Sequence, residues 1–250
     1  MTVIAAIPAR FAAARLPGKP LAVLAGAPVI HHVVQRALAA QHIDAVVVAT
    51  DHEEIARVAS EAGAEAIMTD PDLPSGSDRI GAALEGREAS LIVNLQGDEP
   101  ELDPAMIDAL IEAMETRPEA MIGTISVPLG PGELLDPNCV KVVCDPRGYA
   151  HYFSRAPIGT DRQGLLDGEP NPPSAARRHV GIYAYRGDAL RQFLAAPPSE
   201  LERMERLEQL RAMAVGLPIF VLSADGIPRG IDTQDDLDAA RRRFEGKETP

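Results

Sequence analysis

Short apolar runs alternate with helical periodicity through the N-terminal half of the chain, and this alternation constrains the fold more than any other feature. The apolar runs have the length of buried strands and occupy residues 3–7, 45–50, 65–68 and 91–95. The segments with helical spacing or helix-start signals are 28–41, 52–62 and 104–115. This alternation predicts an α/β fold, a doubly wound and mostly parallel sheet with helices on both faces. In such a sheet, ligands bind at the carboxyl ends of the strands.

The pattern changes in the second half of the chain. Runs at 140–145 and 149–154 flank the turn residues Asp145-Pro146-Arg147-Gly148, which predicts a β-hairpin. Beyond it we expect a loop at 157–175 and a strand at 179–185. Two helices should follow, one from 188 and one over 200–215. A last strand at 219–223 and a C-terminal helix from about 233 should end the chain's pattern. We therefore predict a single domain over 1–250, with 130–215 as a hairpin and helical insertion.

Composition excludes several classes of protein. The net charge of -13 argues against a general nucleic-acid binder, so we expect no nucleic-acid partner. No apolar run approaches the ~18 residues of a membrane span, and the start MTVIAAIPAR lacks the pattern of a signal peptide. The two cysteines, Cys139 and Cys144, have neither a disulfide nor a zinc spacing. We therefore expect a cytoplasmic protein without a membrane partner.

Three cations follow the first expected strand without any nearby acid. Residues 1–43 contain no Asp or Glu but carry Arg10, Arg15 and Lys19, and only alanine stands at 12–14. A triphosphate needs backbone N–H donors and fixed positive charges, which this segment can supply. The segment lacks the glycine patterns of the Walker loop and of dinucleotide-binding proteins. We favour an anion site; an ordinary surface loop with solvated cations is the alternative.

At this point the sequence becomes similar to known enzymes. The block IPARFAAARLPGKPL at 7–21 resembles the signature of sugar nucleotidyltransferases that use CTP. Further blocks resemble the 3-deoxy-manno-octulosonate (KDO) cytidylyltransferase family, also called CMP-KDO synthetases, and follow the order of that family. They are ATDHEEIA at 49–56, SGSDRI at 75–80, NLQGDEP at 94–100, NCVKVVCDPRGYAHYFSRAPI at 138–158, RHVGIYAYR at 178–186, LERMERLEQLR at 201–211 and GIDTQDDL at 230–237.

The resemblance implies a function and a fold type. It implies a nucleotide-diphospho-sugar transferase-like enzyme that transfers CMP from CTP to the anomeric hydroxyl of KDO. Pyrophosphate would be released, Mg²⁺ would be the cofactor, and the pathway would be lipopolysaccharide biosynthesis. It also implies a homodimer, with the insertion binding the sugar and the hairpin and 157–215 forming the interface.

The resemblance also implies the site residues. The set expected to act in catalysis is Arg10, Arg15, Lys19 and Asp98. The set expected to bind the nucleotide is Pro8, Ala9, Arg10, Arg15, Lys19, Thr50, Asp51, Ser75, Gly76, Ser77, Arg79 and Gln96. The set expected to bind the sugar is Arg79, Gln96, Arg155, His179, Tyr183, Glu208 and Gln209. The implied Mg²⁺ ligands are Asp98 and Asp232.

Six of these residues also have a plain structural reading. Asp98 fits a turn, and Asp232 fits a helix start at which Thr233 forms a capping-box-like pair. In the same way, Ser77 fits a helix N-cap and Tyr183 fits a half-buried strand position. Glu208 and Gln209 fit a solvated helix face.

Two departures from the family pattern bear on substrate choice. Ala13 and Ala14 stand where the family usually has hydroxyl residues, and 157–162 lacks the aromatic residue that often follows its proline. An acceptor such as 8-amino-KDO or a sialic acid therefore stays open, as does a nucleotide-binding module without turnover. A dinucleotide-dependent oxidoreductase shares the fold class, but the missing glycine fingerprint argues against it.

Overall fold

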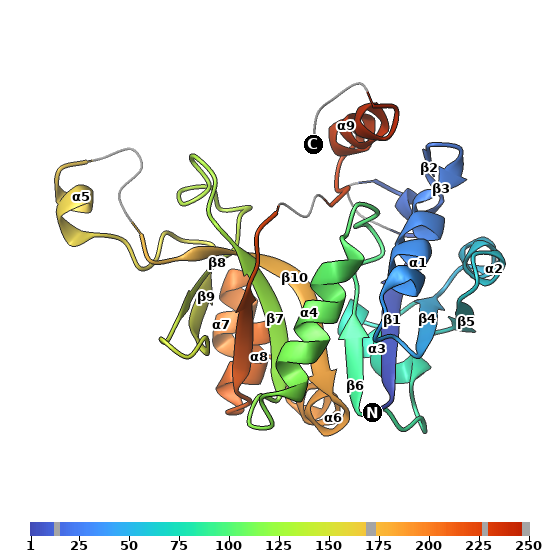
Figure 1. Cartoon of the computed structure of the whole chain (residues 1–250), viewed down its shortest axis with the longest axis horizontal. Coiled ribbons are helices and arrows are strands. Elements are labelled where there is room, and N and C mark those ends of the chain that lie inside the picture. Colours follow the sequence, from blue (N-terminus) through green and yellow to red (C-terminus); the bar gives the residue numbers. More distant parts are fainter. Residues whose placement is uncertain (13–15, 169–173, 227–229, 247–250) are drawn as a thin grey trace. The chain divides into compact units, whose positions relative to one another are not determined.

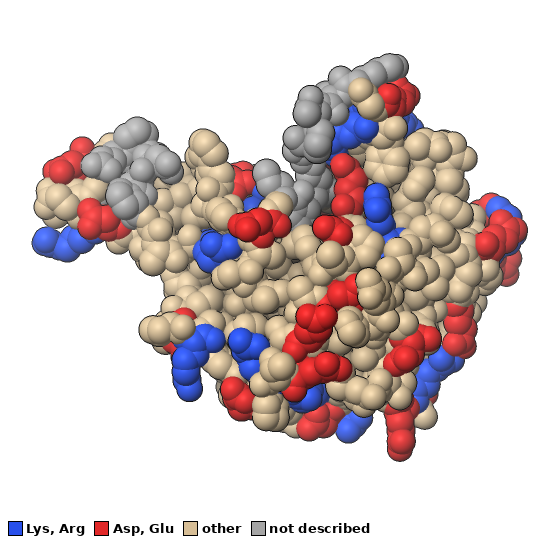
Figure 2. Space-filling view, in the orientation of Figure 1, with Lys and Arg blue, Asp and Glu red and all other residues tan. Residues whose placement is uncertain are grey.

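The computed structural model describes residues 1–12, 16–168, 174–226 and 230–246. The chain forms two compact units, one of Met1–Ile111 with Pro228–Pro250 and one of Glu112–Ile227. Figure 1 labels most elements of both units. Figure 2 shows acidic and basic side chains interspersed on the face in view. No helix in the described ranges combines the length and apolar character that a bilayer crossing requires.

A parallel sheet forms the centre of the first unit. Its strands are β1 (Val3–Ala9), β4 (Ala45–Thr50), β5 (Glu65–Met68) and β6 (Leu91–Asn94). They lie in the order β6-β1-β4-β5, and all neighbouring pairs are parallel. After β1 the chain adds β4 and β5 on one side and then returns to add β6 on the other. The order therefore reverses beside β1, which is where sheets of this kind bind their ligands.

Apolar periodicity explains the helices of the first unit. These elements are η1 (Lys19–Leu21), α1 (Val29–Ala39), α2 (Glu53–Glu61), α3 (Gly76–Ala83) and α9 (Gln234–Phe244), with a small ribbon of β2 (Val23–Leu24) and β3 (Ala27–Pro28). In α1 the side chains of Val29, Val33 and Ala37 are buried, as the helical spacing predicts. The helix α4 (Pro104–Glu115) starts with proline and leads the chain into the second unit.

The second unit is built on a mixed sheet. Its strands are β7 (Ile122–Val127), β8 (Lys141–Cys144), β9 (Ala150–Ser154), β10 (Arg177–Arg186) and β11 (Ile219–Ser223). β11 pairs with β7 in parallel, while β7 with β10, β10 with β8, and β8 with β9 are antiparallel. The helices are α5 (Arg162–Leu166), α6 (Gly187–Ala195), α7 (Glu200–Glu205) and α8 (Gln209–Ala214). Residues 130–215, predicted as an insertion, all lie in this unit.

The α/β class and the hairpin of β8 and β9 confirm the sequence predictions, but several elements differ. The strand β7 was not predicted, and α5 lies in the segment predicted as a loop. The prediction of one helix over 200–215 is wrong, because the chain breaks between α7 and α8. At the break Arg206 adopts a left-handed conformation with φ of 55°, which ends α7. The single domain stays a prediction.

Candidate active site

Two glycines allow the segment after β6 and the start of α3 to pack closely against Pro8 near the end of β1. A Cβ on Gly97 would lie 2.9 Å from the carbonyl oxygen of Pro8, and one on Gly76 would lie 3.2 Å from Cγ of the same proline. Only glycine allows backbone segments to approach so closely. The predicted nucleotide segments after β1, at the start of α3 and after β6 therefore meet at one point.

We predict that Gly97→Ala damages this junction. The new methyl group would collide with the Pro8 carbonyl, so one of the two segments must shift. Overpacking of this kind typically costs about 1–3 kcal/mol, and we expect urea unfolding to show a loss in that range together with weaker CTP binding. Gly230→Ala is the control, because its nearest contact is at 3.8 Å. Equal stability of the two variants would contradict the prediction.

Lys19 forms ion pairs with both predicted metal ligands. Its Nζ forms an ion pair with Asp98 Oδ2 and lies 3.2 Å from Asp232 Oδ1. The backbone N–H of Ile231 donates to the carbonyl of Asp98 at 2.9 Å, which ties the two acidic segments together. Lys19 is mostly buried, while both carboxylates are partly exposed. Two carboxylates far apart in sequence therefore converge on one positive charge.

This donor set fits Mg²⁺. Mg²⁺ is typically held by one or two carboxylates and completes its shell with waters and phosphate oxygens. Across the described residues, no group of three or more His, Cys, Asp and Glu side chains could hold a metal ion. A pair of accessible carboxylates beside a predicted triphosphate loop thus matches the way this ion is bound.

The start of the N-terminal loop is anchored by a buried ion pair. Arg79 Nη2 lies 3.2 Å from Asp51 Oδ2, with side-chain exposures of 3% and 9%. Asp51 Oδ1 accepts from the N–H of Phe11 at 3.0 Å, and Arg79 Nη1 donates to Thr69 Oγ1 at 2.6 Å. Asp51 and Arg79 were predicted to bind the nucleotide, and Arg79 the sugar as well. Here they fix the backbone at Phe11, where the predicted phosphate loop begins.

Two contacts close the base of this loop. The carbonyl of Phe11 accepts from the N–H of Gly18 at 3.0 Å, and the Phe11 ring stacks on His52 with centroids 4.2 Å apart. The side chain of Arg10 is exposed beside this closure. Ala13, Ala14 and the predicted phosphate ligand Arg15 lie outside the described residues.

The helix α3 begins at Gly76 with Ser75 as its N-cap. The Ser75 hydroxyl accepts from the N–H of Asp78 at 3.2 Å and donates to the Asp78 carboxylate at 2.7 Å. The expectation that Ser77 caps this helix is wrong, because Ser77 is its second residue and is buried. Capping by Ser75 places the N-terminus of α3 against Pro8.

In the second unit, part of the predicted sugar set surrounds His179 on β10. The His179 ring packs edge-on against Phe153 at 5.0 Å and lies 5.5 Å from the ring of Tyr183. The charge of Glu208 acts on Tyr183. Gln209 is 6% exposed, and its side-chain Nε2 is buried without a hydrogen-bond partner. Gln209 therefore does not belong to a solvated helix face.

Arg155 has a different environment. Its Nε donates to the carbonyl of Glu205 at 2.9 Å and its Nη1 to the carbonyl of Pro137 at 3.1 Å. The Glu205 carboxylate accepts from Ser154 Oγ at 2.7 Å and from the N–H of Arg155 at 2.9 Å. Burial raises the pKa of Glu205, but these hydrogen bonds outweigh it and lower the pKa overall. Arg155 thus joins the end of β9 to α7.

Burial controls the protonation of the His179 cluster. Although His179 is only half-buried, its packed surroundings lower its pKa to about 3, so the imidazole is neutral near pH 7. Burial raises the pKa of Tyr183 well above its ordinary value, and the charges of Tyr185 and Glu208 add to the effect. The cluster therefore presents a neutral imidazole and a protonated phenol.

We predict that His179 makes the stability depend on pH. Between pH ~6.5 and about 3, the unfolded chain binds a proton at this residue that the folded protein does not. Its contribution to stability is complete above the unfolded pKa and is lost as the pH falls toward 3. In urea unfolding, the free energy of the wild type should fall more steeply than that of His179→Gln, by at most about 1.4 kcal/mol per pH unit. Parallel profiles would count against the depressed pKa.

Lys141 was missed by the sequence predictions. It is fully buried, and its Nζ donates to the carbonyls of Asp136, Cys139 and Arg155, the first two at 2.9 and 2.8 Å. Burial lowers its pKa. A lysine inside the apolar run 140–144 was the available signal, since a charge there needs buried partners.

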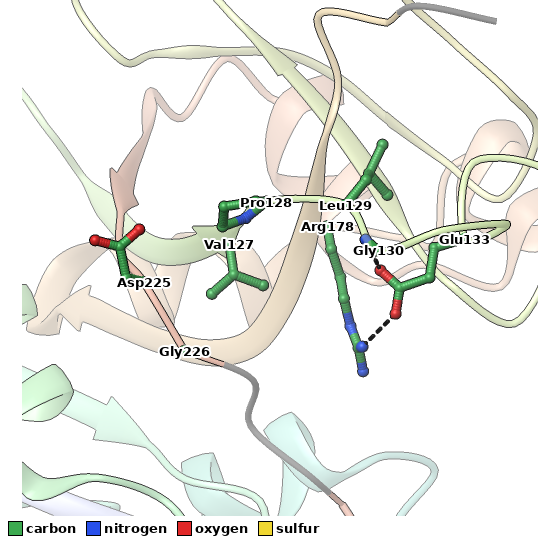
Figure 3. A pocket seen from close by; sticks show the side chains of 8 residues that line it. All are labelled: Val127, Pro128, Leu129, Gly130, Glu133, Arg178, Asp225 and Gly226. Carbon is green, nitrogen blue, oxygen red and sulfur yellow. Dashed lines mark hydrogen bonds and ion pairs between the residues drawn. The ribbon is translucent and has the colours of Figure 1, made fainter. Parts of the chain in front are cut away.

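A separate cavity of about 260 Å³ lies in the second unit (Figure 3). Arg178 and Glu133 form an ion pair of 2.6 Å on its wall, and Glu133 also accepts from the N–H of Gly130. Arg178 and His179 are consecutive residues of β10, so they point to opposite faces of the sheet. The cavity is therefore on the other face from the His179 cluster.

Comparisons with known proteins identify the family of the chain. A family model described as cytidylyltransferase matches residues 4–219. The chain is 46% identical over 240 residues to the 3-deoxy-manno-octulosonate cytidylyltransferase of Syntrophotalea carbinolica, covering 95% of this chain and 96% of that protein. It is 44% identical over 248 residues to the enzyme of the same name from Methylococcus capsulatus, with 96% of each chain covered.

A solved structure extends the match to three dimensions. The structure of CMP:2-keto-3-deoxy-manno-octonic acid synthetase complexed with CTP gives a TM-score of 0.91 at 37% identity, covering 99% of this chain and 100% of that one. The family model, the relatives and the fold together define a nucleotidyltransferase. The chain belongs to the cytidylyltransferase family and, within it, to the 3-deoxy-manno-octulosonate cytidylyltransferases.

Proposed function

We propose that this protein transfers CMP from CTP to the anomeric hydroxyl of KDO and releases pyrophosphate, as a step of lipopolysaccharide biosynthesis. The convergence of Asp98 and Asp232 on Lys19 at the sheet's ligand-binding edge carries the proposal. The chain is 46% and 44% identical, over nearly its full length, to enzymes named for this reaction, which supports the choice of substrates. In the reaction the anomeric oxygen bonds to the α-phosphorus as the bond from that phosphorus to pyrophosphate breaks.

The first unit supplies the residues for the triphosphate. Arg10 and Lys19, with Arg15, would neutralise charge on the phosphates and on the leaving pyrophosphate. Asp98 and Asp232 would hold Mg²⁺, which supplies charge neutralisation at the phosphates and lowers the pKa of the attacking hydroxyl when bound. The N–H of Gly18 donates to the carbonyl of Phe11, which joins two described residues that flank this loop. Positioning of the reacting groups is the main source of rate in such chemistry.

The second unit supplies groups suited to an acidic polyol. The unpaired Nε2 of Gln209 is a buried donor, which favours a ligand oxygen as its partner. Neutral His179 and protonated Tyr183 can bind hydroxyl groups. Among the described residues, Arg155 Nη2 has no partner, while Nε and Nη1 bind carbonyls. We propose that Nη2 contacts the sugar carboxylate, with Glu208 at the polyol.

We further propose a cytoplasmic homodimer. Apolar side chains on the surface of α7 support a partner, since Leu201 and Met204 are 48% and 74% exposed and lie three residues apart on one helix. A second copy of the chain is the partner that the family resemblance implies. Light scattering should give a mass near twice 26.6 kDa. A mass near that of one chain would reject the dimer.

Choice of nucleotide is the direct test of the proposed class. Pyrophosphate release should be followed with KDO and Mg²⁺ and with CTP, UTP, ATP or GTP in separate reactions. We expect release with CTP and at least about tenfold slower release with the other three. A preference for another nucleotide would overturn the cytidylyl assignment, and binding of CTP without release in any mixture would indicate a binding module.

A further inference from the structure

Thr124 places a fully buried hydroxyl against an irregularity in β10. It lies on β7, which pairs with β10, and the register of that pairing shifts between Val180 and Tyr183. The Thr124 Oγ1 lies 3.1 Å from the carbonyl oxygen of Val180, 2.7 Å from that of Ile182 and 3.0 Å from His179 Nε2. One hydroxyl thus contacts two bulge carbonyls and the histidine of the predicted sugar set.

The position of one hydrogen atom follows from these distances. A threonine hydroxyl has a single hydrogen to donate. The carbonyl oxygens of Ile182 and Val180 can only accept a hydrogen bond. Both of their contacts with Thr124 therefore require the hydroxyl hydrogen. The hydroxyl oxygen therefore accepts at its third contact, and His179 Nε2 must carry the hydrogen. A neutral imidazole has one ring N–H, so its Nδ1 is then an acceptor.

Packing keeps the ring in this orientation. The edge-on contact with Phe153 and the contact with Tyr183 confine the imidazole on two sides. Burial also favours the neutral form, in which a single ring nitrogen carries hydrogen. The structure shows no hydrogen-bond partner for Nδ1 among the residues that it describes. The charged and titratable groups acting on the neighbouring Tyr183 are Tyr185 and Glu208.

We propose that Thr124 is a positioning residue that fixes His179 as its Nε2–H tautomer and presents Nδ1 as a hydrogen-bond acceptor to a hydroxyl group of the acceptor sugar. This proposal rests on the proposed function for the identity of the ligand. It assigns His179 to the polyol part of the sugar and separates it from the carboxylate, since an acceptor nitrogen cannot bind a carboxylate oxygen.

Ring-nitrogen NMR of ¹⁵N-labelled protein without substrate tests the tautomer directly. The wild type near pH 7.5 should show His179 as a neutral Nε2–H imidazole, and its signals are identified by their loss in His179→Gln. Thr124→Val should shift His179 toward the Nδ1–H form, while Thr124→Ser keeps the hydroxyl and should keep the wild-type tautomer. A cationic or Nδ1–H His179 in the wild type would overturn the proposal, even where Thr124→Val fails to fold.

Steady-state kinetics test the effect on the sugar. We expect Thr124→Val to raise KM for KDO about tenfold and KM for CTP less than twofold, with Thr124→Ser restoring KM for KDO to within about threefold of wild type. A folded Thr124→Val protein with unchanged KM for KDO would overturn the proposal. A wild type without KDO activity would instead overturn the proposed function, while the spectra would still decide the tautomer.

Discussion

Asp98→Asn and Asp232→Asn should each abolish pyrophosphate release while leaving the protein folded. Each change removes one of the two carboxylate charges that converge on Lys19. A metal ion contributes several kcal/mol to such a reaction, so loss of its ligand should lower the rate about a thousandfold or more. Both carboxylates are partly exposed, so their loss should cost little stability.

Asp235→Asn is the matched control for these two variants. Asp235 is an exposed residue in the first turn of α9, a few positions beyond Asp232, and takes no part in the site. It should keep full activity, and all three proteins should have the same far-UV circular dichroism. Titration with EDTA should stop the wild-type reaction, and added Mg²⁺ should restore it. Substantial turnover by folded Asp98→Asn or Asp232→Asn would sink the metal assignment of that residue.

Arg79→Met should produce the largest loss of stability. The substitution leaves the Asp51 carboxylate buried without its cation, and loss of one partner of a buried pair typically costs about 3–5 kcal/mol. Because Asp51 also holds the N–H of Phe11, CTP binding should weaken as well. Urea unfolding measures the first effect, and calorimetric titration with CTP measures the second.

Arg57→Met provides the comparison for Arg79→Met. Arg57 pairs with Glu54 and Glu61 on the exposed face of α2, where ion pairs contribute less than about 1 kcal/mol. Its loss should therefore barely change unfolding. If Arg79→Met unfolds like Arg57→Met yet binds CTP poorly, Arg79 contacts the nucleotide and is not a structural anchor.

Much of the first unit followed from local sequence signals. The strands β4 and β5 and the helix α4 have the predicted bounds, because compact apolar runs and a proline at a helix start are local features. The convergence of Asp98 and Asp232 could be expected only through family resemblance. No local sequence signal relates two residues that are so far apart in the chain.

What was missed depends on contacts that are distant in sequence. Thr124 contacts the carbonyl of Ile182 because β7 pairs with β10, and Lys141 contacts the carbonyl of Arg155 because β8 pairs with β9. The break at Arg206 separates Glu202 from Arg211, which then form a buried bidentate ion pair with Nε 2.9 Å from Oε2. Periodicity over 200–215 cannot reveal that this pair stabilises two short helices.

The buried environment of Arg79 could not be predicted from its motif. The block SGSDRI correctly marked the start of α3 beside Pro8, but a motif does not say which side chains face the ligand. Arg79 is buried and pairs with Asp51, which accepts a hydrogen bond from the N–H of Phe11. Contact between Arg79 and the nucleotide or sugar stays a prediction, and the burial of its side chain depends on the packed sheet.

The most direct test of the central claim is pyrophosphate release from CTP and Mg²⁺ with KDO, 8-amino-KDO and N-acetylneuraminate offered separately. The account predicts release with KDO, with a kcat/KM at least about tenfold above that for either other sugar, and a product in which CMP is joined to the anomeric oxygen. Preferential use of another acidic sugar would contradict the acceptor assignment and keep the chemistry. An absence of release with all three sugars would contradict the proposed reaction itself.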